Sequence, residues 1–562
     1  GRSGKRREVD AAWTPRSPAA RRRPLSLAYP SSVLTHEPSR ALTLVLAVVG
    51  GLVTELAFPG RSWWPAAAIG VALLVLALRR ESTRWAALVG LVWGLAFFFP
   101  HLYWLYVSVD AVPWVALVLL ESGFIAGLGA AWVWCRRSPA ARSSPVVQAA
   151  VFATVWTVVE QARSVFPFGG FPWGRLAFSQ TDAPTLALAS LGGAPLVSAV
   201  VAGAGALLAG AILAAAAGSA PSHRILAAGT EVALALAVTG AGLLVPLPTA
   251  AESPEPASGG QGDSLRIAAV QGNVAGMGLD AFSRVREVIE NHVAGTQAVA
   301  AAVGAGGVDV VLWPENAADL DPRVDRTTRR LVDSAVATID APILIGTLRF
   351  DDQGRYNDSV LWTPDEGPVA VYTKQHPAPF GEYIPMRGFA RIFSDKVDLV
   401  RTDMLPGTEV GAVPLDVPRL GRTVVLAVAI CFEVAYDGLV RSAVLAGGEM
   451  IVVQTNNASF GLTQESVQQL AMTRLRAVEH GRTAVQISTV GVSGVIAPDG
   501  TVLDRTGLFE ADQMIETVPL RSTITLADRL GVWPQWAAAL VAALAFASGL
   551  ATTRRDRKRV RP

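Results

Sequence analysis

The segment between residues 41 and 247 constrains the fold most, because it is almost uninterrupted Leu, Val, Ala, Gly and Trp. A helix needs about 20 apolar residues to cross a bilayer. Pro, Gly and charged breaks divide this segment into seven candidate membrane spans, and an eighth lies near the C-terminus. We expect the spans at residues 41–58, 64–78, 86–106, 112–134, 146–162, 185–216, 225–247 and 531–550. Only 17% of the chain is charged, against about a quarter in soluble proteins.

The spans divide the chain into six parts. We predict a basic disordered arm (1–40), seven transmembrane helices (41–248), a linker (249–264), a domain of mixed polarity (265–524), an eighth transmembrane helix (531–550) and a basic tail (551–562). Lys and Arg in short loops favour the cytoplasmic side. The arm, the loops at 79–84 and 136–142 and the tail are rich in Arg and fall on one side. Both termini are therefore expected in the cytoplasm, and residues 265–524 outside it.

Residues 265–524 show alternating strand and helix patterns. Continuous apolar runs of this kind are typical of sheets that are covered on both faces, which predicts a layered α/β domain. Strands are expected at 265–272, 309–315, 342–350, 358–364, 369–374, 423–432, 450–456 and 484–490, and helices at 281–303, 324–338, 436–447 and 466–481.

Three of the predicted strands end in a residue with reactive chemistry: Glu315, Lys374 and Cys431. Reactive groups often lie where strands end and loops begin. A thiol with a pKa near 8.5 needs a base or a nearby cation before it can attack an ester, and Glu315 and Lys374 could supply these. Taken singly, Cys431 could be a small buried apolar residue and the other two surface charges. Cys135, the second cysteine, ends a span on the opposite side, so no disulfide is expected.

The motifs around these residues resemble a known family. WPE (313–315), YTK (372–374), PFGEYIP (379–385) and ICFE (430–433) are similar to the Glu, Lys and Cys motifs of the nitrilase superfamily, in the version found in apolipoprotein N-acyltransferases. The resemblance includes the apolar half, in LAFPG (56–60), HLYWL (101–105), VVEQAR (158–163) and GFPWGRLAFSQ (170–180). It covers residues 41–550, which distinguishes this chain from soluble nitrilases.

The resemblance implies a polytopic bundle of about eight transmembrane helices carrying an αββα sandwich, in the inner membrane of a bacterium. It implies transfer of a fatty acyl group from a membrane phospholipid to the α-amine of an S-diacylglyceryl-cysteine lipoprotein, through a thioester. Cys431 would be the nucleophile, Glu315 the general base and acid, and Lys374 the oxyanion donor, supported by Glu382, Glu433 and Phe432. It implies a monomer without cofactor, metal or nucleic-acid partner.

Three positions depart from the family pattern. Many relatives have Tyr at the position of Phe432, and Asp and Trp at the positions of Asn457 and Ser459. These changes leave Glu315, Lys374 and Cys431 intact but put contacts to the acyl acceptor in doubt.

A lipid substrate would reach the site most easily through an opening toward the bilayer. Residues 383–393 combine Phe389 and Phe393 with Arg387 and Arg391, which suits a lid that enters lipid and meets anionic head groups. The alternative is an ordinary loop that packs its own Phe residues. Further candidates for the lid, its opposing wall or substrate contact are Phe380, Trp173, Phe171 and Asn456.

Two other functions remain open. A membrane-tethered amidase of the same superfamily would release the acyl group to water. A transporter with an exported domain would explain Glu55, Glu121 and Glu231 within predicted spans, but these acids show no repeat pairing between halves. Glu160 and Arg163, one helical turn apart, are expected to pair and to orient the loop at 170–173.

Overall fold

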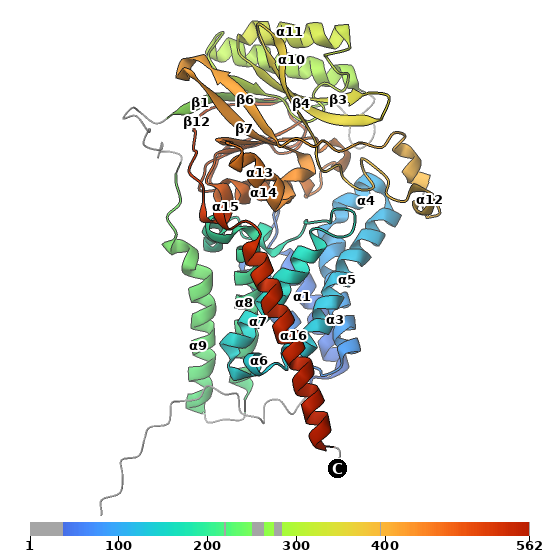
Figure 1. The fold of residues 1–562 in the computed structure, drawn as a ribbon, viewed down its shortest axis with the longest axis vertical. Helices are drawn as coiled ribbons and strands as arrows, with labels where there is room; N and C mark the ends of the chain where they lie inside the picture. Colours follow the sequence, from blue (N-terminus) through green and yellow to red (C-terminus); the bar gives the residue numbers. More distant parts are fainter. Residues whose placement is uncertain (1–36, 218–220, 250–262, 275–283, 394, 561–562) are drawn as a thin grey trace, which may run out of the picture.

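A computed structural model of the chain describes residues 37–217, 221–249, 263–274, 284–393 and 395–560. A helical bundle and a layered α/β part follow one another along the longest axis (Figure 1). The predictions for the arm (1–40) and the linker (249–264) lie almost wholly outside the described residues, and that for the tail (551–562) partly so.

The bundle is built from helices with well-defined starts. Three of them begin at a serine N-cap. The side chains of Ser39, Ser82 and Ser144 accept hydrogen bonds from Leu42 N, Trp85 N and Val147 N. The helices are α1 (Arg40–Glu55), α2 (Pro65–Ala77), α3 (Thr83–His101), α4 (Tyr103–Val109), α5 (Ala111–Cys135), α6 (Pro139–Ser143), α7 (Pro145–Arg163), α8 (Ala189–Ala216), α9 (Pro221–Gly240) and α16 (Trp533–Val560).

Within the described residues, five helices are long and apolar enough to cross a membrane: α3, α5, α9, α16 and α8 with the turn before it. The predicted count of about eight is therefore not confirmed. The helices α1 and α2 have only 16 and 13 residues, and α7 carries Glu160, Gln161 and Arg163 in its last turn.

The α/β part contains two six-stranded sheets. The first has the order β12-β1-β2-β3-β4-β5 and the second β11-β10-β9-β8-β7-β6. The pairs β1–β2, β2–β3, β7–β8 and β8–β9 are parallel. The strands are β1 (Ser264–Gln271), β2 (Val310–Leu312), β3 (Ile343–Phe350), β4 (Arg355–Thr363), β5 (Gly367–Thr373), β6 (Ala412–Val417), β7 (Arg422–Ile430), β8 (Met450–Thr455), β9 (Ala484–Ser488), β10 (Gly494–Ile496), β11 (Val502–Arg505) and β12 (Asp512–Pro519).

All eight predicted strands are present, and four more were missed: β6, β10, β11 and β12. Three of these four have alternating or mixed burial, and β10 has only three residues. A search for continuous apolar runs does not detect such strands.

The two sheets form the middle of four layers. Their inner faces share one core, in which Ile267 and Leu344 of the first sheet meet Val428 and Val452 of the second. The helices α10 (Val285–Val303) and α11 (Arg326–Ile339) cover the first sheet. The helices α13 (Asp437–Leu445) and α14 (Glu465–His480) cover the second. This is the αββα arrangement that the resemblance implied.

The layer of α13 and α14 also packs on the bundle. The hydrophobic core on its outer side runs without a break from Leu475 and Val440 to Phe98, Trp156 and Val197 of the bundle. One layer therefore serves both halves of the molecule, and it lies between the sheets and the bundle in Figure 1.

The loop after α7 ties the halves together through buried polar contacts. Trp173 Nε1 donates to Gln468 Oε1 at 2.6 Å, and the Arg175 guanidinium pairs with Asp437 at 2.7 Å. The predicted pair of Glu160 with Arg163 is wrong. Arg163 instead pairs with Glu121 at 3.1 Å and donates to the carbonyl oxygens of Phe171 and Trp173.

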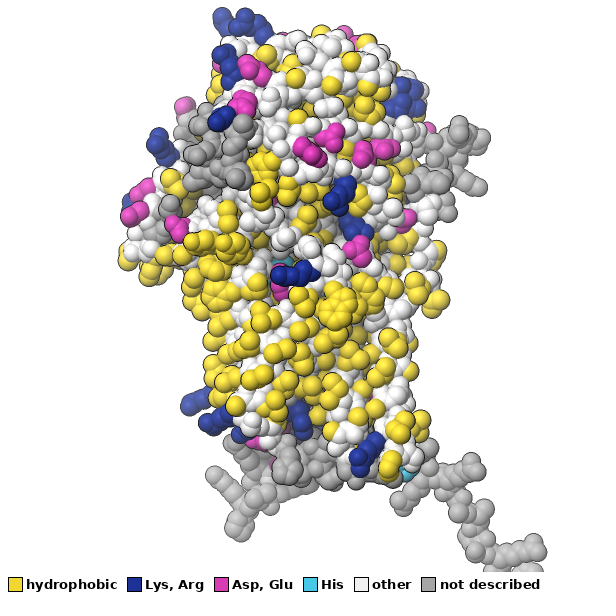
Figure 2. Space-filling view, turned by 180° about the vertical axis from the view of Figure 1, so that it is seen from behind, with side chains coloured by type: hydrophobic (Ala, Val, Ile, Leu, Met, Phe, Trp, Pro, Cys, Tyr) yellow, Lys and Arg dark blue, Asp and Glu magenta, His cyan; other side chains and the backbone are white. Residues whose placement is uncertain are grey.

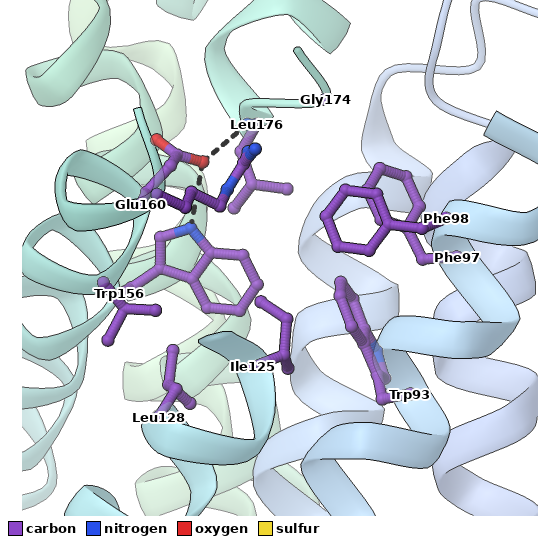
Figure 3. A pocket seen from close by; sticks show the side chains of 11 residues that line it. Trp93, Phe97, Phe98, Ile125, Leu128, Trp156, Glu160, Gly174 and Leu176 are labelled. Carbon is purple, nitrogen blue, oxygen red and sulfur yellow. Dashed lines mark hydrogen bonds between the residues drawn. The ribbon is translucent and has the colours of Figure 1, made fainter. Parts of the chain in front are cut away.

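Glu160 also contacts the segment that follows α7. Its Oε1 accepts hydrogen bonds from Trp156 Nε1 and Leu176 N, beside a cavity of about 10 Å³ in the bundle (Figure 3). That volume has room for about one water. Arg163 therefore does orient the loop, as predicted, but through its carbonyl oxygens rather than through Glu160.

Candidate active site

The three residues that the sequence singled out lie at strand ends in one buried place. Glu315 follows β2, Lys374 follows β5, and Cys431 follows β7 directly. Gly346 on β3 permits the close approach of the Glu315 loop, because a Cβ there would lie 2.3 Å from Pro314 O. Glu315 and Lys374 are buried, and Cys431 is partly exposed.

Glu315 is held by donors on both oxygens. Its Oε1 accepts from Asn357 Nδ2 at 2.7 Å and from Lys374 Nζ at 3.2 Å, and its Oε2 accepts from the Asn456 backbone N–H at 2.9 Å. Burial raises the pKa of Glu315, and the charge of Lys374 opposes this rise. A carboxyl whose pKa is raised is suited to accept and return a proton near neutral pH.

Lys374 lies between two carboxylates. Its Nζ is 2.7 Å from Glu382 Oε1, and Glu382 Oε2 accepts from the Ala378 N–H at 2.6 Å. Burial acts to lower the pKa of Lys374, but Glu315 and Glu382 together raise it well above its usual value. The ammonium therefore keeps its charge and its position.

Cys431 starts a tight turn, η7 (Cys431–Ala435), with a φ of +55°. Non-glycine residues adopt this region at a cost of about 1–3 kcal/mol, and such residues cluster at active sites. Gln469 Nε2 lies 3.7 Å from the sulfur. Burial and the charge of Glu315 raise the pKa of Cys431, and Lys374 lowers it. The resting group is thus a thiol that needs a base.

Glu433 connects the cysteine turn to the end of the lysine strand. It is fully buried, and it accepts from Ile430 N at 2.7 Å, from Gln375 N at 2.7 Å, from His376 N at 3.1 Å and from the Tyr372 hydroxyl at 2.9 Å. Burial raises the pKa of Glu433, while these hydrogen bonds favour its charged form. Its contacts are all internal, so it braces the site.

No sequence pattern pointed to Asn357, Gln469 and Glu465 as site residues. Asn357 becomes visible only through the pairing of β4 with the end of β5, where its carbonyl accepts the Lys374 N–H at 2.9 Å. Gln469 and Glu465 belong to α14. Within the described residues, no group of His, Cys, Asp and Glu could hold a metal ion.

The lid candidates are only partly brought to the site. The short helix α12 (Arg387–Ala390) leaves Phe389 58% and Phe393 59% exposed. Arg387 and Arg391 were expected to meet lipid head groups, but they already pair with Asp403 and Asp398. The segment reaches the bundle through Phe380, whose ring centroid lies 6.0 Å from that of Phe168.

Trp173 lies next to the residue that follows Cys431. It is buried and stacks on Phe432 with ring centroids 5.9 Å apart, and Phe171 also stacks on Phe432, with ring centroids 5.5 Å apart. A hydrogen bond to Gln468 holds its indole under the cysteine turn, and the role of Trp173 as a wall opposite residues 383–393 stays a prediction.

Comparisons with known proteins agree with this architecture. Residues 50–207 match the model of the apolipoprotein N-acyltransferase N-terminal domain, and residues 266–528 match the carbon-nitrogen hydrolase model. An apolipoprotein N-acyltransferase of Mycolicibacterium smegmatis is 38% identical over 88% of this chain and 82% of its own length. One from Pseudomonas aeruginosa is 28% identical over 87% of this chain and 92% of its own length. The crystal structure of an amidase from Nesterenkonia sp. is 19% identical, with a TM-score of 0.35, over 49% of this chain and 97% of that chain.

The identity and coverage of the mycobacterial relative decide the assignment, and both family models fall on the two halves that the fold shows. The chain belongs to the apolipoprotein N-acyltransferase family.

Proposed function

We propose that this acyltransferase moves a fatty acyl group from a membrane phospholipid to the N-terminal α-amine of a diacylated lipoprotein, through a thioester on Cys431. The observation that carries the proposal is the buried set of a thiol, a proton-accepting carboxyl and a fixed ammonium. Glu315 and Lys374 are joined at 3.2 Å, and both act electrostatically on Cys431. A thiol with these two partners suits acyl transfer.

In the first half-reaction, Glu315 takes the proton from the Cys431 thiol, and the sulfur attacks the carbonyl carbon of the phospholipid ester. Negative charge develops on the carbonyl oxygen, beside Lys374 Nζ and the Phe432 backbone N–H. One such donor typically lowers a barrier by about 3 kcal/mol. The carbon–oxygen bond then breaks, Glu315 returns the proton to the lysophospholipid alkoxide, and the acyl group remains on Cys431.

In the second half-reaction, the lipoprotein amine attacks the thioester carbonyl. Glu315 takes a proton from the attacking nitrogen, the carbon–sulfur bond breaks, and the proton passes to the Cys431 sulfur. Glu382 keeps Lys374 in place through both halves, with Nζ 2.7 Å from its Oε1. The products are an amide and the free thiol.

We infer that the bundle spans the inner membrane with about eight helices and that the catalytic domain lies outside the cytoplasm. On the face shown in Figure 2, hydrophobic side chains cover the bundle, and Lys and Arg side chains gather at the end away from the α/β part. At that end Arg136 donates to the carbonyl oxygens of Leu78 and Arg80, and Arg137 pairs with Glu81. Positive charge favours the cytoplasmic side. Trp533 and Trp536 are exposed near the opposite end, as in an interfacial belt.

We also propose that the segment 380–393 enters the outer leaflet beside the site. Its apolar side chains Met386, Phe389, Ile392 and Phe393 are all at least 58% exposed, which is unusual for a patch that faces water. Because Arg387 and Arg391 pair with Asp403 and Asp398, we expect apolar contact, rather than charge, to drive entry of the segment into lipid. Turnover of phospholipid that is unchanged in the double variant Phe389→Ser/Phe393→Ser would contradict this placement.

Intact-protein mass spectrometry after incubation with phospholipid alone tests the first half-reaction. We expect a hydroxylamine-labile acyl adduct on the wild type and none on Cys431→Ala. If the wild type in lipid never acquires this adduct, the phospholipid-donor mechanism is wrong. Release of acid from small soluble amides, without any acylated lipopeptide, would then favour the membrane-tethered amidase.

A further inference from the structure

A second carboxyl lies close to Cys431 and has no part in the mechanism above. Glu465 is the first residue of α14 and is 2% exposed. Its Oε2 accepts a hydrogen bond from Asn457 Nδ2 at 2.6 Å. Among the residues that the structure describes, none forms an ion pair with Glu465, although the carboxyl is as buried as Glu315.

A short chain of hydrogen bonds connects Glu465 to the sulfur. Asn457 Nδ2 also donates to Gln469 Oε1 at 3.0 Å, and Gln469 Nε2 lies 3.7 Å from Cys431 Sγ. The neighbouring residue, Asn456, donates its backbone N–H to Glu315. Two consecutive residues at the end of β8 thus hold two carboxyls near one thiol. Glu315 acts electrostatically on Glu465, and Glu465 acts on Cys431. Lys374 interacts with both Glu315 and Cys431.

A buried carboxyl without a cation is unfavourable in its charged form. Lys374 cannot compensate Glu465, because its ammonium already contacts Glu315 and Glu382. At neutral pH the resting Glu465 is therefore mainly the neutral acid, and an ammonium bound beside it would stabilise the carboxylate once that proton is lost to water. After the first half-reaction the thioester is neutral, and the next substrate to arrive is a primary amine, which is an ammonium ion at neutral pH.

We propose that Glu465 binds the α-ammonium of the acyl acceptor and takes its first proton. This rests on the proposed function, since it concerns the second half-reaction alone. An ammonium must lose two protons to become an amide N–H. The first passes from R–NH₃⁺ to the Glu465 carboxylate, which leaves a neutral amine able to attack. The second leaves the attacking nitrogen through Glu315 and ends on the Cys431 sulfur.

The proton affinities of the two groups match. Burial, with repulsion from Glu315, raises the pKa of Glu465 to about 8, and an α-amino group has a pKa of about 7.7–8.0. Proton transfer between groups of similar pKa is nearly thermoneutral, which is the favourable case for a general base. Glu315, bound to Lys374, is reserved for protons on sulfur, oxygen and the attacking nitrogen.

The test separates the half-reactions in the full-length enzyme in lipid. Acyl-enzyme is first prepared with phospholipid, and its decay is then followed by intact mass after a lipopeptide acceptor is added. Methoxyamine, which is already neutral at pH 7, serves as the second acceptor. We compare wild type with Glu465→Gln, which keeps an acceptor for Asn457, and with Glu366→Gln, an exposed carboxyl in the β4–β5 turn, as the charge control.

We expect Glu465→Gln to form the thioester at the wild-type rate, to transfer it to methoxyamine normally, and to transfer it to the lipopeptide about 100-fold more slowly. The Glu366→Gln enzyme should match wild type in all three. Equal loss with both acceptors, loss of thioester formation, or no loss at all would each overturn the role of Glu465. If Glu465→Gln fails to fold, the pH profiles of the wild type decide. We expect an inflection near pH 8 in the transfer rate to the lipopeptide and none in the transfer rate to methoxyamine. An inflection near pH 8 with both acceptors would overturn the role of Glu465. Failure of the wild type to form a thioester would instead count against the proposed function.

Discussion

The substitution Glu433→Gln tests whether this carboxylate braces the catalytic turn. Glu433 Oε1 accepts from two backbone N–H groups, of Gln375 and His376, while Oε2 accepts from that of Ile430 at 2.7 Å. A glutamine can keep its carbonyl oxygen on the side with more donors. Its NH₂ group then faces the Ile430 N–H, which loses its partner. A hydrogen bond to a charged group contributes about 1.5–3 kcal/mol.

Hydrogen exchange measures this loss directly. If the Ile430 amide exchanges by local opening, a loss of 1.5–3 kcal/mol corresponds to exchange that is about 10- to 150-fold faster, at about 1.4 kcal/mol per factor of ten. The amides of Gln375 and His376 should change much less. Glu366→Gln, at an exposed turn, should leave all three unchanged. Unchanged exchange at Ile430 in Glu433→Gln, or equal acceleration at all three amides, would refute the assignment of the two oxygens.

Three further predictions concern neighbouring residues. Because the pKa of Glu465 is raised to about 8, the folded state holds a proton that the unfolded chain releases above about pH 4.3. The stability that this proton confers is full below that pH and is lost as pH rises to 8, so Glu465→Gln should flatten the fall in melting temperature between pH 5 and 8. Asn457→Asp places two carboxyls about 2.6 Å apart and should lower the melting temperature at pH 8, an effect that Glu465→Gln in the same chain should remove. Trp173→Ala deletes a buried indole that contacts Phe432 and Gln468 and should cost about 3–5 kcal/mol, measured as denaturant unfolding of the α/β part in detergent.

The catalytic strand ends were predictable because each of them closes a continuous apolar run. Glu315 and Cys431 follow β2 and β7, which are buried toward the site, whereas Lys374 follows the edge strand β5, where Tyr372 is buried but Val369 and Val371 are exposed. A strand with both faces covered, such as β2 or β7, has a continuous apolar pattern that can be recognised in the sequence, and β5 shows a similar apolar run although one of its faces is exposed. The order in which the strands pair cannot be recognised in the sequence. Asn357 was missed for this reason, although it donates a hydrogen bond to Glu315.

The residues of α14 were missed for a different reason. Helix prediction assumes a polar face toward water, yet Gln468, Gln469, Thr473 and Arg476 of α14 are all buried. The helix lies between the second sheet and the bundle, so both of its faces are interior. In the sequence its polar side chains indicate a face in contact with water. In the structure they contact the active site and the bundle.

The position of α14 also links the membrane half to the chemistry. Gln468 accepts from Trp173 of the loop after α7, and the next residue, Gln469, donates toward Cys431. The outer side of α13 and α14 belongs to a core shared with the bundle, so removal of the bundle would expose apolar surface directly behind the cysteine turn. Exposure of that surface is unfavourable by about 25 cal/mol per Å². The α/β part of this chain therefore differs from a hydrolase domain that is merely tethered, because its catalytic turn packs on the bundle through Phe432, Phe171 and Trp173.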